Sequence, residues 1–275
     1  MSAVRGRLPG LAAWAAAVLA PILVAVPPAA AASPGASACG APALAYRVAG
    51  SWPHREEAFT QGLVLDAGEL VEGTGRYGHS SVARLDPETG AVLAKHPLPA
   101  RYFGEGVTVL GERIWQLTWK AGRAFTYDRE TLAALGEHAY AGEGWGLTHD
   151  GRHLIMSDGS DVLQRRDPRS FELVARIPVR TAGRPVRRLN ALELAEGSLY
   201  ANVWLTDCIA RIAPATGTVT GWIDLSRLRA RMPPLPAAAV ANGIAWDAER
   251  RLLVVTGKLW PRLFLLDLAA AAPPD

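Results

Sequence analysis

The sequence predicts an all-β fold, a five-bladed β-propeller. Two observations carry this prediction: an aspartate-containing turn recurs about every 45 residues, and a short motif that opens each unit recurs at a similar spacing. Strand-length segments separated by turn residues fill the rest of the chain. No amphipathic helix is evident beyond the N-terminal region, and residues 224–240 allow at most one helical turn and a loop.

Residues 1–38 are expected to lie outside this fold. They contain Arg5 and Arg7, an apolar run to about Val26, and then small residues with several A-x-A cleavage sites. This pattern predicts a secretory signal peptide. A transmembrane anchor is the alternative, but Pro21 and the Ala/Pro/Ser-rich stretch favour cleavage. The propeller domain is then 39–275, exported to the periplasm or the medium, with no stable membrane span after cleavage.

The two cysteines and the net charge limit the compartment and the partners that can be expected. Cys39 and Cys208 are the two cysteines of the chain, and in an exported protein they can form one disulfide. Cys39 also follows Ala-Ser-Ala, which loosely resembles a lipobox, so a lipid anchor on Cys39 is the less favoured alternative. Without Arg5 and Arg7 the formal charge falls from +3 to about +1. No basic block remains, so nucleic acid is not an expected partner. We expect a monomer.

The repeated turn has a clear local chemistry. It occurs as LDPETG (85–90), YDRETL (127–132), RDPRSF (166–171), IAPATG (212–217) and LLDL (265–268). Its aspartate, replaced by Ala213 in the fourth unit, recurs at intervals of 42, 39, 46 and 54 residues. Aspartate bonds its own backbone, proline fixes φ and glycine accepts a positive φ, so each motif predicts a turn between strands.

The short motif that opens each unit aligns the five units residue by residue, more clearly than the turn does. It reads TQGLVL (60–65), GEGVTV (104–109), GWGLTH (144–149), LNALEL (189–194) and ANGIAW (241–246). The residues before its small third position form a first set: Gln61, Glu105, Trp145, Asn190 and Asn242. Fourteen residues later, or sixteen in the fifth unit, comes a second set: Gly75, Trp119, Gly159, Trp204 and Lys258. Five units of four strands each describe a five-bladed propeller; a β-sandwich, the main alternative, would not require this repetition.

Both sets should meet at one mouth of the central channel. The innermost strand of a blade starts there, and the antiparallel second strand returns to the same face. The two sets carry varied polar and aromatic residues while the surrounding turns stay similar, as expected for a binding site on a symmetric scaffold. The alternative is that the amides only satisfy backbone groups at strand ends.

The chemistry of this mouth is limited. Glu105 is the candidate acid or base and Lys258 the candidate cation. The amides are Gln61, Asn190 and Asn242, and the walls are Phe59, Phe103, Trp119, Trp145 and Trp204. A carboxylate among aromatic rings has a raised pKa, which suits proton transfer near neutral pH, and lysine and amide donors suit a developing oxyanion.

Other motifs favour no further chemistry. GTGRYG (73–78) satisfies G-x-G-x-x-G but precedes a strand rather than a helix, so it predicts no dinucleotide site. His149 and His153 lie on either side of a hairpin turn, so catalytic zinc is not expected. No G-x-S-x-G motif is present, and a two-carboxylate glycosidase would need a second acid in the mouth. We expect neither a metal nor a cofactor.

Ten segments in order resemble the glutaminyl-peptide cyclotransferases of the plant and bacterial type: FTQGL (59–63), EGTGRYGHSS (72–81), YFGEG (102–106), QLTW (116–119), GEGWGLT (142–148), LIMSDGS (154–160), ANVWLTD (201–207), GWIDL (221–225), NGIAWD (242–247) and VTGKLWP (255–261). The resemblance covers nearly all of 39–275. It departs from the family at Ala191, where an acid is common.

The resemblance implies an acyltransferase that converts the N-terminal glutamine of peptides to pyroglutamate and releases ammonia without a metal. By the family pattern Glu105 is the proton shuttle, Lys258 and Asn190 polarise or anchor the amide oxygen, and Gln61 orients the amino end. The aromatic walls would select a glutamine-sized side chain, with Asn242 also counted among the binding residues.

Two alternatives remain at this point. One is a non-catalytic propeller that binds peptide N-termini or a small polar ligand. The other is a propeller hydrolase or lyase acting on a sugar lactone, which would need a carboxylate-rich metal site.

Overall fold

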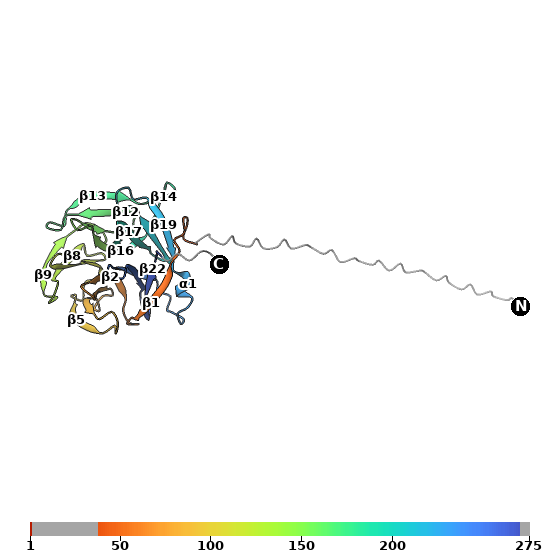
Figure 1. Cartoon of the computed structure of the whole chain (residues 1–275), viewed down its shortest axis with the longest axis horizontal. Helices are drawn as coiled ribbons and strands as arrows, with labels where there is room; N and C mark the ends of the chain where they lie inside the picture. The colour runs from red at the N-terminus through yellow and green to blue at the C-terminus, as the bar shows by residue number, and fades with distance from the viewer. Residues whose placement is uncertain (2–37, 270–275) are drawn as a thin grey trace. The chain divides into compact units, whose positions relative to one another are not determined.

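The fold is a five-bladed β-propeller. The computed structural model describes Met1 and residues 38–269. Within 38–269, five four-stranded antiparallel sheets surround a common centre (Figure 1). This confirms the predicted fold class. Helix α1 (Ser226–Arg229) is the one helical turn expected between 224 and 240. Residues 2–37 of the expected signal peptide lie outside the described residues.

The first four blades follow one another along the chain. Blade 1 consists of β2 (Thr60–Asp66), β3 (Glu69–Thr74), β4 (Ser81–Leu85) and β5 (Val92–Pro97). Blade 2 consists of β6 (Gly104–Leu110), β7 (Arg113–Thr118), β8 (Arg123–Asp128) and β9 (Ala134–Ala139). Blade 3 consists of β10 (Leu147–His149), β11 (Leu154–Met156), β12 (Val162–Arg166) and β13 (Leu173–Pro178). Blade 4 consists of β16 (Leu189–Ala195), β17 (Ser198–Val203), β18 (Cys208–Ile212) and β19 (Val219–Asp224), and β14 (Arg180–Thr181) pairs with β15 (Arg184–Pro185) between blades 3 and 4.

Blade 5 joins the two ends of the domain. It consists of β20 (Ala241–Asp247), β21 (Leu252–Gly257), β22 (Arg262–Asp267) and β1 (Arg47–Pro53). The N-terminal strand β1 pairs antiparallel with β22, from Arg47 opposite Asp267 to Pro53 opposite Arg262. The ring is therefore closed by hydrogen bonds between segments far apart in sequence.

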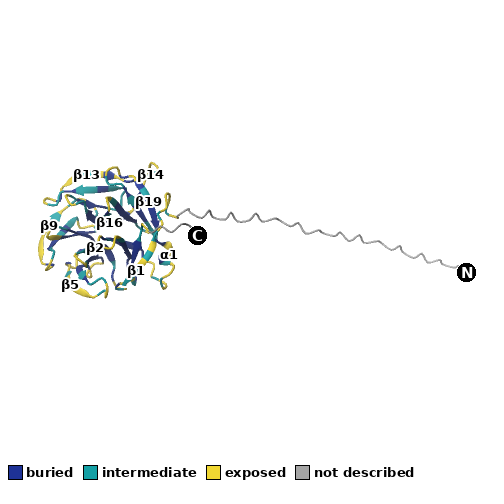
Figure 2. Cartoon of the chain, in the orientation of Figure 1, coloured by how far each residue is buried: buried dark blue, intermediate teal, exposed yellow. Residues whose placement is uncertain are grey.

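Burial decreases from the centre outwards, as Figure 2 shows. The inner strands β2 and β6 are almost wholly buried, whereas the outer strands β5 and β9 are largely exposed. The apolar core lies between neighbouring blades. Leu63 and Leu70 of blade 1, for example, pack with Ala245 and Val254 of blade 5. Burial of such aliphatic side chains stabilises the ring by roughly 1.5–3 kcal/mol each.

The inner strands approach one another so closely that the third position of the opening motif must be small. A Cβ on Gly62 would lie 2.3 Å from the backbone nitrogen of Val107 in the next blade, and a Cβ on Gly146 would lie 2.0 Å from the carbonyl oxygen of Asn190. Glycine removes this contact. The repeated small residue is thus a packing requirement of the channel.

The predicted aspartate turns are present. The carboxylates of Asp86, Asp128 and Asp167 each accept hydrogen bonds from backbone N–H groups two and three residues further on. Each turn connects the third and fourth strands of its blade, so local side-chain chemistry sets these reversals.

A buried polar network ties the closure of the ring to blade 1. The Glu72 carboxylate accepts hydrogen bonds from Thr60 at 2.7 Å and from Arg55 at 2.5 Å, and it contacts the His54 ring at 3.0 Å. The other nitrogen of His54 lies 2.7 Å from the carbonyl oxygen of Trp260 in blade 5. Burial alone would raise the pKa of Glu72, but the hydrogen bond and charge of His54, together with Arg55, outweigh it and lower this pKa to about 2. Burial also opposes protonation of His54, but Glu72 raises the pKa of this ring above its usual value.

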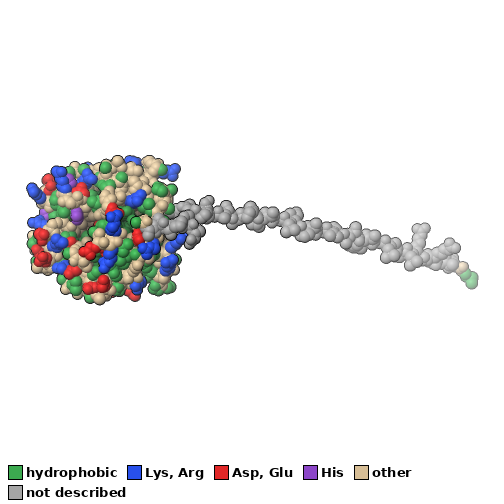
Figure 3. Space-filling model, in the orientation of Figure 1, with side chains coloured by type: hydrophobic (Ala, Val, Ile, Leu, Met, Phe, Trp, Pro, Cys, Tyr) green, Lys and Arg blue, Asp and Glu red, His purple; other side chains and the backbone are tan. Residues whose placement is uncertain are grey.

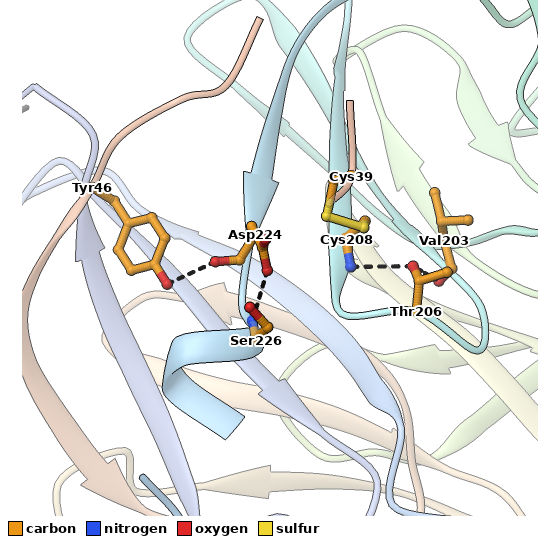
Figure 4. Close-up of a disulfide and its surroundings, with 7 residues drawn as sticks. All are labelled: Cys39, Tyr46, Val203, Thr206, Cys208, Asp224 and Ser226. Atoms are coloured by element: carbon orange, nitrogen blue, oxygen red, sulfur yellow. Dashed lines mark hydrogen bonds between the residues drawn. A yellow bond between two sulfur atoms is a disulfide. The ribbon is translucent and has the colours of Figure 1, made fainter. Parts of the chain in front are cut away.

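A disulfide holds the segment before β1 against blade 4. Cys39 is bonded to Cys208 of β18, across 169 residues of sequence (Figure 4). Nearby, the backbone of Leu44 donates to the carbonyl oxygen of Trp222, and the Tyr46 hydroxyl donates to that of Asp224. A disulfide of this kind forms in an oxidising compartment. It also leaves no thiol on Cys39 for a lipid.

The outer surface carries charges of both signs. Figure 3 shows basic and acidic side chains interspersed on one face of residues 38–269. Between residues 38 and 269, no helix has the length and apolar character needed to span a membrane.

We predict that Glu72→Gln lowers the free energy of unfolding by about 3–5 kcal/mol, because it leaves the buried His54 without a charged partner and leaves Arg55 with only the exposed Glu57, at 3.5 Å. Stability contributed by Glu72 is present above the unfolded pKa of about 4.3 and is lost as the pH falls towards about 2. Stability contributed by His54 is present below about pH 6.5 and is lost as the pH rises through its raised folded value.

Urea unfolding from pH 2 to 8 tests this. The variant should lose the decline between about pH 4 and 2 that the wild type shows. Glu88→Gln, an exposed glutamate, is the control and should change stability by less than about 0.5 kcal/mol. An unfolding midpoint for Glu72→Gln equal to that of the wild type would show that the network does not stabilise the ring.

Candidate functional site

β-Bulges contain four of the five residues of the first set, at the start of the inner strands. Strand pairing shifts register between Thr60 and Gly62, between Gly104 and Val107, between Leu189 and Leu192, and between Ala241 and Ile244. Gln61, Glu105, Asn190 and Asn242 lie within these irregularities, and Trp145 precedes β10 in blade 3. A bulge redirects a side chain out of the normal alternation of the strand.

The second set is held beside the first by one repeated backbone hydrogen bond. The N–H of Gly75, Trp119, Trp204 and Lys258 donates to the carbonyl of Phe59, Phe103, Arg188 and Val240, respectively, at 2.9 Å in each case. Each acceptor lies two residues before a member of the first set. The end of the second strand is thereby joined to the entry of the inner strand in four of the five blades.

The two sets enclose a cavity of about 250 Å³. Nine of the predicted site residues line it: Phe59, Gln61, Phe103, Glu105, Trp119, Trp145, Asn190, Trp204 and Lys258. Typical sites for drug-sized ligands measure about 300–1,000 Å³, so this cavity suits one small group. Among its lining residues Glu105 is the one carboxylate and Lys258 the one cation.

Part of the rim was not anticipated from the sequence. Leu205 and residues Ala237, Ala238 and Val240 also line the cavity. The last three come from the Pro/Ala-rich loop after α1. The apolar composition of this loop was the one feature of the sequence that could have indicated a contact with the cavity.

Glycines of the second set make room for aromatic rings that lie in, or directly before, the opening motifs. A Cβ on Gly75 would lie 2.2 Å from Cε1 of Phe103, and a Cβ on Gly159 would lie 2.7 Å from Cζ2 of Trp145. Phe103 then contacts Trp119 with ring centroids 5.6 Å apart, and Trp145 contacts Trp204 edge to face at 5.4 Å. These glycines allow the walls to close.

Glu143 fixes two of these walls and was not singled out from the sequence. Its Oε2 atom accepts hydrogen bonds from the indole N–H of Trp119 at 2.7 Å and of Trp145 at 2.9 Å. One carboxylate on the loop before β10 therefore orients indoles from two blades. Its place in GEGWGLT, two residues before Trp145, was the available signal.

A chain of amides leads to Glu105. Asn242 donates through Nδ2 to Gln61 Oε1 at 3.1 Å, and Gln61 donates through Nε2 to Glu105 Oε1 at 3.1 Å. Asn242 also donates to the carbonyl of Thr60 and accepts from the N–H of Ala191. It is fully buried and lies behind Gln61 rather than on the cavity wall. Asn242 thus sets which way the Gln61 amide faces.

The charged groups of the cavity have shifted pKa values. Burial raises the pKa of Glu105 well above its usual range, Lys258 opposes this increase, and the negative charge of Glu143 adds to it. Burial lowers the pKa of Lys258, and Glu105 opposes that decrease. Both shifts move the pKa of the group towards neutral pH, and a pKa near the working pH makes proton transfer most effective.

Asn190 offers an unused hydrogen-bonding group. Its Oδ1 atom is buried without a partner in the protein. A buried polar atom of this kind costs about 1–3 kcal/mol unless a ligand or water satisfies it. Asn190 lines the cavity, so this oxygen lies close to any molecule that is bound there.

Across residues 38–269, no three or more His, Cys, Asp or Glu side chains are grouped so that they could hold a metal ion. The lactone-type site that the sequence left open requires such a group. The described side chains therefore provide no observation that favours that alternative.

Three comparisons with known proteins point to the same family. A family model described as glutamine cyclotransferase matches residues 19–268. The chain is 43% identical over 229 residues to a glutaminyl-peptide cyclotransferase of Arabidopsis thaliana, which covers 82% of this chain and 72% of the plant protein. It is also similar to the crystal structure of Myxococcus xanthus glutaminyl cyclase, with a TM-score of 0.76 and 37% identity over 82% of this chain and 98% of the other.

We predict that Gly75→Ala destabilises the fold by about 1–3 kcal/mol, because the added methyl group displaces the Phe103 ring. Gly50→Ala is the matched control, since no atom lies within 4 Å of its added Cβ. Urea unfolding of both variants measures the difference. Equal stability of the two variants would contradict the close packing of Phe103 on Gly75.

Proposed function

The chain belongs to the glutamine cyclotransferase family and converts the N-terminal glutamine of peptides to pyroglutamate with release of ammonia; we propose that Glu105 is the proton shuttle of this reaction. The observation that supports this role is the single buried carboxylate in a cavity of about 250 Å³ that five aromatic rings wall. In this reaction the α-amine of the substrate attacks its own side-chain amide carbon. The pocket contributes by holding the side chain folded back on the amine.

The proton balance of the reaction needs one group that both accepts and donates. The attacking amine loses one proton as the new C–N bond forms, and the leaving nitrogen gains one proton as the old C–N bond breaks. A free α-amine has a pKa near 7.7–8.0, so its neutral, nucleophilic form is accessible at neutral pH. A carboxylate whose pKa is raised by burial can take the first proton and supply the second.

Lys258 and Asn190 are suited to the substrate amide. Negative charge develops on the amide oxygen during attack, and we assign the Lys258 ammonium to stabilise it together with the Asn190 side chain. The unsatisfied Oδ1 of Asn190 can accept a hydrogen bond from a substrate N–H. In this proposal the Asn190 side chain holds the substrate carboxamide through both its N–H donor and its Oδ1 acceptor.

Gln61 and Asn242 act on the amino end of the substrate. Gln61 is held between Asn242 and Glu105 by hydrogen bonds, so its remaining amide functions face the cavity in a fixed orientation. We propose that Gln61 orients the α-amine towards Glu105. Asn242 then acts as a positioning residue through Gln61.

The aromatic walls supply selectivity. Phe59, Phe103, Trp119, Trp145 and Trp204 enclose the cavity, and we propose that they admit a glutamine-sized side chain and exclude water. Exclusion of water strengthens every electrostatic interaction inside the pocket. A non-catalytic propeller that binds peptide N-termini is the second candidate. It would use the same walls but would not require a buried carboxylate with a raised pKa.

We propose that residues 1–38 are a signal peptide, that 39–275 is secreted or periplasmic, and that the enzyme is a metal-independent monomer. The disulfide between Cys39 and Cys208 supports an oxidising destination.

We predict that Glu105→Gln lowers kcat on a Gln-initiated peptide by about 10²–10⁴-fold, because no other carboxylate lines the described cavity. Ammonia release and loss of 17 Da from the peptide measure turnover. Glu193→Gln is the matched control: this carboxyl is also buried and its pKa is also raised, but it does not line the cavity. Wild-type turnover by a folded Glu105→Gln variant would refute the shuttle role, and no turnover by folded wild-type protein would favour the binding module.

A further inference from the structure

A second cavity adjoins the cyclisation pocket and shares one wall with it. It has a volume of about 280 Å³, and Phe59 lines both cavities. Basic side chains dominate its lining: Arg55, Arg76, His79 and Lys95. The cyclisation reaction makes no use of these groups, so they require a separate explanation.

Two of these cations lack a charged partner. Arg55 is occupied, because it pairs with Glu72 at 2.5 Å and with Glu57, the carboxylate of this second cavity, at 3.5 Å. Neither Arg76 nor Lys95 has a carboxylate within 4.0 Å among the described residues. The second cavity therefore presents uncompensated positive charge to whatever enters it.

The backbone of Arg76 is held in an unfavourable conformation that places its side chain at the shared wall. Its φ of 95° is positive, which is uncommon for a non-glycine residue and tends to occur at functional sites. Its guanidinium lies 4.6 Å from the ring centroid of Phe59. The Lys258 ammonium lies 4.8 Å from the same centroid. One ring thus contacts the cation of the cyclisation pocket and a cation of the second cavity.

The second cavity is within reach of a bound peptide. The cyclisation pocket has room for one side chain, so the residues that follow the N-terminal glutamine must leave it. An extended chain advances about 3.3–3.6 Å per residue. The side chain of the second or third residue can therefore reach past Phe59 to Arg76.

We propose that this second cavity binds a carboxylate of the peptide substrate, and that the enzyme prefers peptides in which glutamate or aspartate follows the N-terminal glutamine at the second or third position. This inference rests on the proposed cyclotransferase function. Arg76 and Lys95 are the residues that recognise the carboxylate, and Phe59 divides glutamine recognition from acid recognition.

A set of C-terminally amidated pentapeptides tests the preference. Gln-Glu-Ala-Ala-Ala and Gln-Ala-Glu-Ala-Ala are each compared with the uncharged isostere, Gln-Gln-Ala-Ala-Ala and Gln-Ala-Gln-Ala-Ala respectively, and with Gln-Lys-Ala-Ala-Ala. At low salt we expect at least one of the acidic peptides to show a kcat/KM on the order of fivefold above the isostere, the value for one partly exposed ion pair. The lysine peptide should fall below it, and about 0.5 M salt should remove most of the difference.

Variants assign the preference to this second cavity. Arg76→Gln and Lys95→Gln should each reduce the acidic-to-isostere ratio of kcat/KM, and the double variant should bring it to about 1. The ratio is internal to each variant, so a general loss of activity cancels. Lys120→Gln is the control and should keep the wild-type ratio: this exposed lysine lies 4.1 Å from the Trp119 ring and lines neither cavity.

The possible results distinguish a failure of the acid preference from a failure of the cyclotransferase function. Turnover of all the amidated peptides at one rate, or a ratio that persists in the double variant, overturns the acid preference and leaves the cyclotransferase standing. Gln-Ala-Ala is also compared with a free and with an amidated C-terminus. A gain seen only for the free C-terminus also overturns the acid preference, since the second cavity would then recognise the terminal carboxylate. No turnover of any peptide would overturn the proposed function and the preference with it.

Discussion

The close approach of five inner strands at the channel is the constraint on which the rest of the structure depends. It requires a small residue at the third position of each opening motif, because a Cβ on Gly62 or Gly146 would overlap the backbone of the next blade. The strands bulge at these points in four blades, and a bulge turns the neighbouring side chain towards the mouth. The same packing that closes the ring therefore buries Glu105, and that burial raises the pKa of the carboxyl.

A buried carboxyl is useful only if its surroundings are fixed before the substrate arrives. Gln61 is locked by Asn242 and donates to Glu105, while Glu143 orients two indoles and raises the pKa of Glu105 through its charge. Such preorganised groups need not rearrange during the reaction. Their positions depend in turn on an intact ring, which the Glu72 network and the Cys39–Cys208 disulfide hold closed.

The features that could be predicted from the sequence are those that local residue chemistry sets and that every blade repeats. The aspartate turns and the small third position repeat because every blade needs them, so they revealed the number of blades and the register of both sets. The closure of blade 5 by β1 was missed, since a single strand leaves no repeat. Glu143 and the rim residues Leu205 and Ala237 were missed because their contacts with the pocket arise from tertiary packing. Asn242 was recognised as part of the mouth, but only the structure places it behind Gln61.

The most direct test of this account is the pKa of Glu105 itself, measured by NMR titration of carboxyl-labelled protein with Glu105→Gln to assign the signal. We expect a value well above the ordinary 4.3 of a glutamate. Glu143→Gln should lower this pKa, because the variant removes a neighbouring negative charge, whereas Glu112→Gln, which changes a carboxylate outside the pocket, should leave it unchanged. An ordinary value in the wild type, or no response to Glu143→Gln, would contradict the claim that burial in this pocket prepares Glu105 to move a proton.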